Sequence, residues 1–101
     1  MAGLVPGREL PDEYIVILAH HDGQGLCAPK AREDRICNGA VDNASGVAAM
    51  LEIAQYLADQ AERKKLTLRR DIVFAAWSGE ELGLLGSDHF VDAFAGDAHQ
   101  T

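Results

Sequence analysis

The order of elements in this sequence predicts an α/β fold built on a βαβα unit. Two runs, residues 14–19 and 71–77, are almost entirely apolar without polar alternation, which is typical of strands buried on both faces of a parallel sheet. Between them, apolar side chains recur at helical spacing over residues 47–57. A strand, a helix and a strand in this order predict parallel strands joined by a right-handed crossover.

The segments around these elements are expected from their turn residues. Residues 1–13 are punctuated by proline and glycine and are expected to form a loop lead-in or the remnant of a preceding strand. Ser45 or Asn43 is the expected N-cap of the crossover helix. A second, short helix is expected over residues 84–94, with Gly96 as its stop.

Composition limits the chain to one domain and excludes some classes of partner. The 101 residues are 48% hydrophobic and 25% charged, and 16 acidic against 9 basic residues give a net charge of -7. This charge argues against nucleic acid or an anionic membrane as the main partner. No apolar run approaches the roughly 20 residues of a membrane span. The first residues lack the basic and apolar regions of a secretory signal, so the compartment stays open.

Two cysteines, Cys27 and Cys37, lie in the polar segment after the first strand. They would pair in an oxidising compartment and would be free thiols in a reducing one. The sequence leaves both states open.

Polar side chains with catalytic potential follow the ends of both predicted strands and open the crossover helix. They are His20, Asp22, Asp42, Glu80 and Glu81. Ligands of open parallel sheets bind beyond the carboxyl ends of the strands, so these side chains are expected at one rim. His21 would point the opposite way from its neighbour along an extended chain and is not expected to be a ligand.

Each of these motifs alone has an ordinary structural interpretation. His20 and Asp22 could be turn residues, and Asp42 could cap a helix. The two glutamates could be a solvated helix start that favours the helix dipole. Their coincidence at one rim favours a metal site instead. Histidine and carboxylates without cysteine are the ligand set of hydrolytic zinc, manganese or cobalt sites.

Three motifs carry a family resemblance: Ala-His-His-Asp at residues 19–22, Gly-Ala-Val-Asp-Asn-Ala-Ser-Gly at 39–46, and Trp-Ser-Gly-Glu-Glu-Leu-Gly-Leu-Leu-Gly-Ser at 77–87. In order and spacing, residues 14–91 resemble the zinc aminopeptidase family, metallopeptidase family twenty-eight. Relatives of this family include bacterial leucyl aminopeptidases, glutamate carboxypeptidases and glutaminyl cyclases. The resemblance implies a mostly parallel, three-layer sheet of the zinc-exopeptidase kind.

The resemblance implies an aminopeptidase that hydrolyses the N-terminal bond of a peptide or amino-acid derivative. It implies two zinc ions, with manganese or cobalt as alternatives, and a hydroxide bridging them. His20, oriented by Asp22, would bind one ion. Asp42 would bridge both ions and Glu81 would bind the second. Glu80 would be the general base.

The same resemblance implies a cis peptide bond between Asp42 and Asn43, and a domain larger than this chain. The family supplies a further aspartate and a further histidine from segments beyond the double glutamate. The later candidates in this chain, none of them expected to be those ligands, are Asp88, His89, Asp92, Asp97 and His99. Residues 1–101 are therefore expected to be the amino-terminal part of a catalytic domain, incomplete on its C-terminal side. Exposed sheet edges would then favour self-association.

Two other functions stay open. The chain could be a non-catalytic α/β module with weak or no metal binding, or a single-zinc transferase similar to glutaminyl cyclase. Asn43 and the intact double glutamate favour the peptidase. Family members are often secreted or periplasmic, but neither the compartment nor the preferred substrate side chain follows from the sequence.

Overall fold

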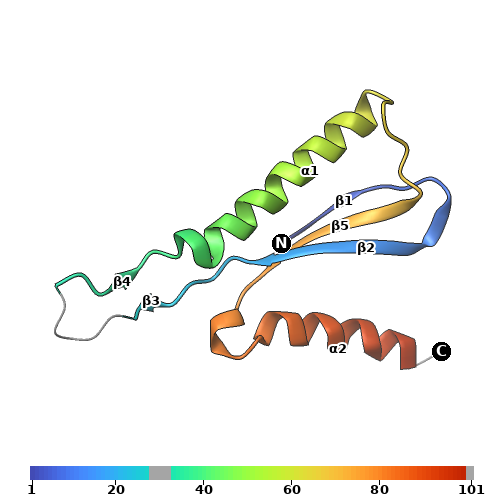
Figure 1. The fold of residues 1–101 in the computed structure, drawn as a ribbon. Coiled ribbons are helices and arrows are strands. Elements are labelled where there is room, and N and C mark those ends of the chain that lie inside the picture. Colours follow the sequence, from blue (N-terminus) through green and yellow to red (C-terminus); the bar gives the residue numbers. More distant parts are fainter. Residues whose placement is uncertain (28–32, 100–101) are drawn as a thin grey trace.

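The sheet has three strands in a computed structural model that describes residues 1–27 and 33–99, residues 94–99 by their backbone alone. β5 (Arg70–Trp77) is the central strand, flanked by β1 (Ala2–Val5) and β2 (Leu10–His20). β2 runs parallel to β5, whereas β1 runs antiparallel to it. The fold is thus mixed α/β (Figure 1).

The predicted βαβ unit is confirmed. Helix α1 (Gly46–Glu62) connects β2 to β5, extends five residues further than expected, and covers one face of the sheet. Ser45 stands at the N-cap position without a capping hydrogen bond from its side chain, and Asn43 Oδ1 accepts a hydrogen bond from the Gly46 N–H at 3.2 Å instead. The core lies between α1 and the sheet, and its buried side chains are Val5, Ala19, Met50, Ile72, Phe74 and Ala76.

Of the two alternatives for residues 1–13, the structure shows the preceding strand, and a loop over the whole segment is wrong. β1 pairs with β5 from Ala2 to Val5, and β2 begins at Leu10, well before the apolar run. Only Val5 of β1 is buried, so the strand lacks the alternation that would have revealed it. Pro6 and Gly7 begin the connection between the two strands instead of interrupting one.

Burial of β2 on both faces is also wrong for the described residues. Tyr14, Ile15 and Leu18 are 45–51% exposed, because β2 is an edge strand that only β5 pairs and α1 covers one face. The molecule is correspondingly flat. Its radius of gyration is 17.3 Å and its extents are 57 × 39 × 13 Å, whereas a compact domain of 100 residues has a radius of gyration near 13 Å. A mostly parallel, three-layer sheet stays a prediction.

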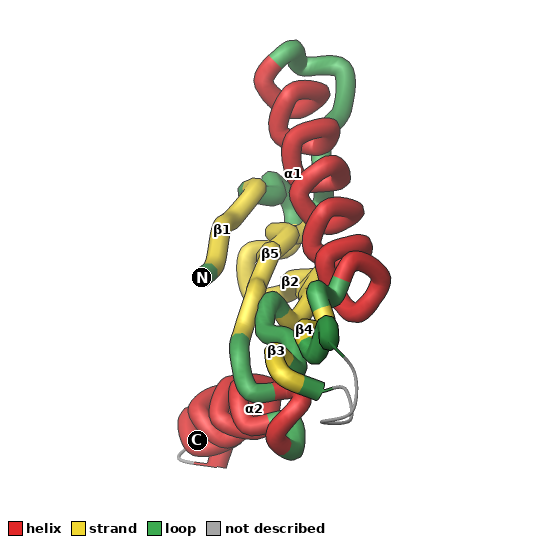
Figure 2. Tube along the Cα trace, turned by 90° about the vertical axis from the view of Figure 1, so that its left-hand side faces the viewer, coloured by secondary structure: helices red, strands yellow, loops and turns green. Residues whose placement is uncertain are grey.

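Helix α2 (Leu85–His99) follows a single 3₁₀ turn at Glu80–Leu82. Figures 1 and 2 show α1 and α2 on opposite sides of the sheet. The ring of Phe90 lies 5.0 Å from the ring of Trp77 and joins α2 to the end of β5. Gly96 does not stop the helix as expected, since one interior glycine costs only about 1 kcal/mol.

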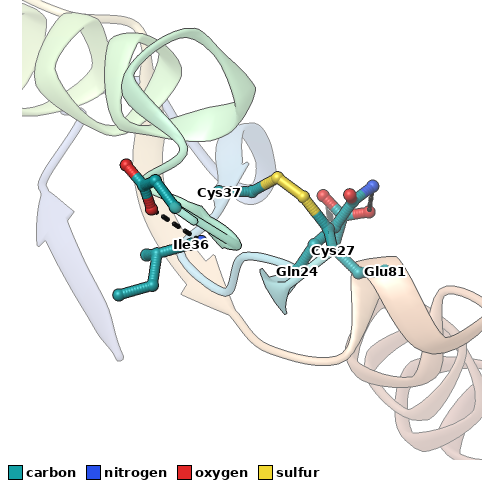
Figure 3. The surroundings of a disulfide bond; sticks show 6 residues. Gln24, Cys27, Ile36, Cys37 and Glu81 are labelled. Atoms are coloured by element: carbon teal, nitrogen blue, oxygen red, sulfur yellow. Dashed lines mark hydrogen bonds between the residues drawn. A yellow bond between two sulfur atoms is a disulfide. The ribbon is translucent and has the colours of Figure 1, made fainter. Parts of the chain in front are cut away.

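A short hairpin interrupts the segment between β2 and α1. β3 (Gly25–Leu26) pairs antiparallel with β4 (Ile36–Cys37), and a disulfide joins Cys27 to Cys37 with their Cα atoms 5.8 Å apart (Figure 3). The structure therefore shows the paired alternative for the cysteines. Within the described residues, no helix is both long and apolar enough to cross a membrane.

Candidate metal centre

The site lies where β2 and β5 end together. Register pairs His20 with Trp77, the last residues of the two parallel strands, so the segments that follow both strands start at the same rim. Glu80 and Glu81 come three and four residues after Trp77. The turn Ala40–Ser45, which leads into α1, reaches this rim from the other side.

Three of the predicted side chains converge there. The potential ligand atoms of His20, Asp42 and Glu81 all lie within 4.8 Å of one another. His20 Nε2 lies 3.2 Å from Asp42 Oδ1. Asp42 is mostly exposed, with 67% of its side-chain surface accessible, whereas the His20 side chain is only 14% exposed. The cluster is thus open on the Asp42 side and closed behind the imidazole.

The orientation of His20 is fixed by its Nδ1 nitrogen. Nδ1 lies 3.2 Å from the backbone carbonyl oxygen of Asp22 and 3.4 Å from its carboxylate. A carbonyl oxygen only accepts hydrogen bonds, so Nδ1 carries a proton, and Nε2, which faces Asp42, is the nitrogen that a metal could bind in place of a proton. Burial lowers the pKa of His20, but the bond to the Asp22 carbonyl and the charges of Glu80, Asp22 and Asp42 raise it overall. The ring therefore lies in a negative environment that also favours a metal cation.

Asp22 connects the two strand ends. Its carboxylate accepts hydrogen bonds from the N–H groups of Glu80 at 3.3 Å and Glu81 at 3.2 Å. Burial raises the pKa of Asp22, but these two backbone bonds, its own N–H and the nearby His20 lower it overall. Asp22 thus stays ionised and holds the glutamate turn against the end of β2. Its backbone carbonyl, more than its carboxylate, orients His20.

Asn43 contributes to the site in a way that the sequence did not indicate. Its Nδ2 donates to the carbonyl oxygen of His20 at 3.2 Å, while its Oδ1 caps α1. The Asp42–Asn43 peptide bond is cis, as the resemblance implied. Gly39 begins this turn with φ of 72°, and a Cβ there would lie 2.8 Å from the Asp42 carbonyl oxygen. Glycine is therefore needed at this position.

The two glutamates point to different partners. Glu80 Oε2 lies 3.7 Å from His20 Nε2 and its side chain is 36% exposed. Glu81 Oε2 accepts a hydrogen bond from Gln24 Nε2 at 3.2 Å. The other Glu81 oxygen, Oε1, is buried and has no hydrogen-bond partner among the residues that the structure describes.

That orphaned oxygen is the observation that favours a metal. A buried carboxylate oxygen without a partner is costly, and such atoms in folded proteins call for an explanation. A divalent cation coordinated by Glu81 and Asp42, with His20 nearby, would supply one. One imidazole and two carboxylates suit zinc, and also manganese or cobalt. The residues present therefore fit the implied metal.

The remaining candidates lie outside this cluster. His21 is exposed, and its N–H donates to the Trp77 carbonyl oxygen at 3.0 Å. Asp88, His89 and Asp92 are exposed on α2. The side chains of Asp97 and His99 fall outside the described residues.

Two open hollows border the cluster. One of about 350 Å³ is lined by Asp22, Asp42 and the first turns of α1. The other, of about 260 Å³, is lined by Gln24, Cys37, Asp42 and Glu81, among others. Asp42 borders both hollows.

Comparison with known proteins gives the chain a family context. It matches the profile of Peptidase family M28 over residues 1–101. It is 35% identical over 92 residues to Aminopeptidase NAALADL1 of Rattus norvegicus, covering 91% of this chain and 11% of that protein. It is 36% identical over 90 residues to Probable glutamate carboxypeptidase LAMP1 of Arabidopsis thaliana, covering 89% of this chain and 11% of that protein.

A third relative is named as a receptor and not as a peptidase. Transferrin receptor protein 1 of Gallus gallus is 30% identical over 97 residues, which cover 96% of this chain and 11% of the receptor. The chain thus spans about a tenth of the length of these relatives. No solved structure matches it significantly.

Proposed function

This chain belongs to Peptidase family M28, and from that premise we propose that it forms part of the catalytic domain of a metal-dependent exopeptidase, an aminopeptidase. The observation that carries the proposal is the buried Oε1 of Glu81, which has no hydrogen-bond partner among the described residues and belongs to a carboxylate that converges with His20 and Asp42. The substrate class would be peptides or amino-acid derivatives with a free amino terminus.

The proposed centre would hold two zinc ions, with manganese or cobalt as alternatives. His20 would bind one ion, Glu81 the other, and Asp42 both. A metal bound there would lower the pKa of a water molecule toward neutrality and polarise the scissile carbonyl. The further aspartate and histidine would come from chain beyond residues 1–101, which we propose to be a partial catalytic domain.

Glu80 is the proposed general base. Its carboxylate lies at the edge of the cluster, near His20 but outside the set of converging ligand atoms. It could therefore take a proton from the attacking water and return it to the leaving amine as the peptide bond breaks. Asp22, through the N–H groups of Glu80 and Glu81, holds both glutamates in place.

A non-catalytic module is the second candidate. It is favoured by the relative named as a receptor and not as a peptidase. The single-zinc transferase is less well supported, because Asn43 and both glutamates of the peptidase motif are present.

Metal content and turnover, measured together on the intact protein that carries these residues, separate the candidates. We expect stoichiometric zinc and hydrolysis of an aminoacyl p-nitroanilide, with loss of turnover when the substrate's amino group is acetylated. Removing the metal with a chelator should abolish hydrolysis, and adding zinc should restore it. Metal without hydrolysis of any unblocked aminoacyl substrate would support the non-catalytic module.

We also propose that the isolated 101 residues self-associate through the edge of β2. Ile15 and Leu18 expose apolar surface there, and no strand within the described residues covers their edge. Analytical ultracentrifugation should show species larger than a monomer, and Leu18→Lys should reduce them more than Leu26→Lys, which changes an exposed leucine on the hairpin. A monomer with a sharp, reversible two-state melt would refute the proposal.

A further inference from the structure

The β3–β4 hairpin places a side chain against the candidate metal centre. Gln24, immediately before β3, donates from Nε2 to Glu81 Oε2 across 57 residues of sequence. Figure 3 shows Gln24 and Glu81 beside the Cys27–Cys37 disulfide. This bond uses one oxygen of the Glu81 carboxylate, and the other, Oε1, is buried without a hydrogen-bond partner within residues 1–27 and 33–99.

We propose that Gln24 is a positioning residue for Glu81, carried by the disulfide-closed hairpin. By binding Oε2, the amide fixes the rotation of the carboxylate so that Oε1 is the oxygen available to a metal ion. Groups that hydrogen-bond to metal ligands in this way commonly contribute 10–100-fold to metal affinity. The inference rests on the proposed role of Glu81 as a ligand.

The disulfide matters because little else holds the hairpin. β3 and β4 have two residues each, and their register consists of Gly25 with Cys37 and Leu26 with Ile36. Isolated two-stranded hairpins are only marginally stable in water. The Cys27–Cys37 disulfide holds β3 against β4 and therefore restricts the position of Gln24, the residue before β3. Cys37 also lines the smaller hollow together with Gln24, Asp42 and Glu81. Loss of the disulfide should therefore weaken the hold of Gln24 on Glu81.

Zinc affinity of the intact protein, measured by competition with a chelating dye, tests this. Gln24→Met keeps the length of the side chain and removes the donor. We expect it to weaken zinc binding about tenfold. Leu26 is also exposed and lies in β3 itself. Leu26→Ala should therefore change zinc affinity less than about twofold. With cobalt in place of zinc, Gln24→Met should also shift the visible absorption bands, because the geometry of a ligand changes.

A double-mutant cycle shows whether Gln24 acts through Glu81. In a Glu81→Ala background, Gln24→Met should have no further effect on zinc affinity. Reduction of the disulfide should weaken binding in the original protein and have no added effect in Gln24→Met. Unchanged zinc affinity in Gln24→Met, or an effect of Gln24→Met that persists without Glu81, would overturn the positioning role of Gln24 and leave the proposed metal site standing. If Glu81→Ala itself leaves zinc affinity unchanged, the proposed metal site falls, and the positioning role falls with it.

Discussion

Replacing Glu80 by Gln should lower kcat on the order of 10³-fold and change zinc affinity less than about threefold. A general base contributes roughly 10²–10⁴ to rate, and glutamine keeps the shape of the side chain without being able to accept a proton at neutral pH. Metal binding should survive because Glu80 lies outside the converging ligand atoms. Steady-state kinetics and dye competition on the same preparation measure the two effects.

Glu52→Gln is the matched control for this substitution. Glu52 is exposed on α1, so the change removes an equal charge away from the rim and should leave kcat unaltered. Full activity of Glu80→Gln would exclude Glu80 as the base. Parallel loss of zinc and activity would instead make Glu80 a ligand.

Replacing Asp42 by Asn should remove both bound metal and activity, whereas Glu80→Gln should remove activity alone. The amide oxygen is neutral and cannot supply the shared negative charge that two cations require. Losing a group that only hydrogen-bonds to a metal ligand typically lowers metal affinity roughly 10–100-fold. Asp42 would bind the metal itself, so we expect Asp42→Asn to lower zinc affinity by more than about 100-fold. Zinc content after dialysis against a chelating buffer is the measurement.

Asp12→Asn provides the control, because Asp12 is an exposed carboxylate near the start of β2, far along the strand from the rim. That variant should keep its zinc and its activity. An Asp42→Asn protein that retained stoichiometric zinc would show that Asp42 only shapes the turn into α1.

The convergence of three candidate ligands could be predicted from the sequence because the ends of the strands determine it. An apolar run that stops at a polar residue marks the carboxyl end of a buried strand. Two such runs in a βαβ unit must end at the same rim. His20 and Trp77 do lie in register, which brings the residues after each strand together. The direct consequence is the convergence of His20, Asp42 and Glu81, which lie up to 61 residues apart in the chain.

Other features depend on contacts with distant segments of the chain and not on a pattern in the residues themselves. β1 is a strand because β5 pairs with it, although its own residues show no alternation. The exposure of Leu18 follows from β2 being at an edge, which an apolar run alone cannot reveal. Gln24 lies in a polar segment without any motif. Only the hairpin and its disulfide bring it to Glu81.

His20, Asp42 and Glu81 are the proposed protein ligands of two metal ions at this rim. Crystals of the intact protein grown with zinc, with diffraction recorded on both sides of the zinc absorption edge, test this proposal most directly. We expect two anomalous peaks that share the Asp42 carboxylate, one beside His20 Nε2 and the other beside the Glu81 carboxylate. Stoichiometric zinc in solution with both peaks elsewhere, or with the Glu81 carboxylate turned away from both, would contradict the proposal.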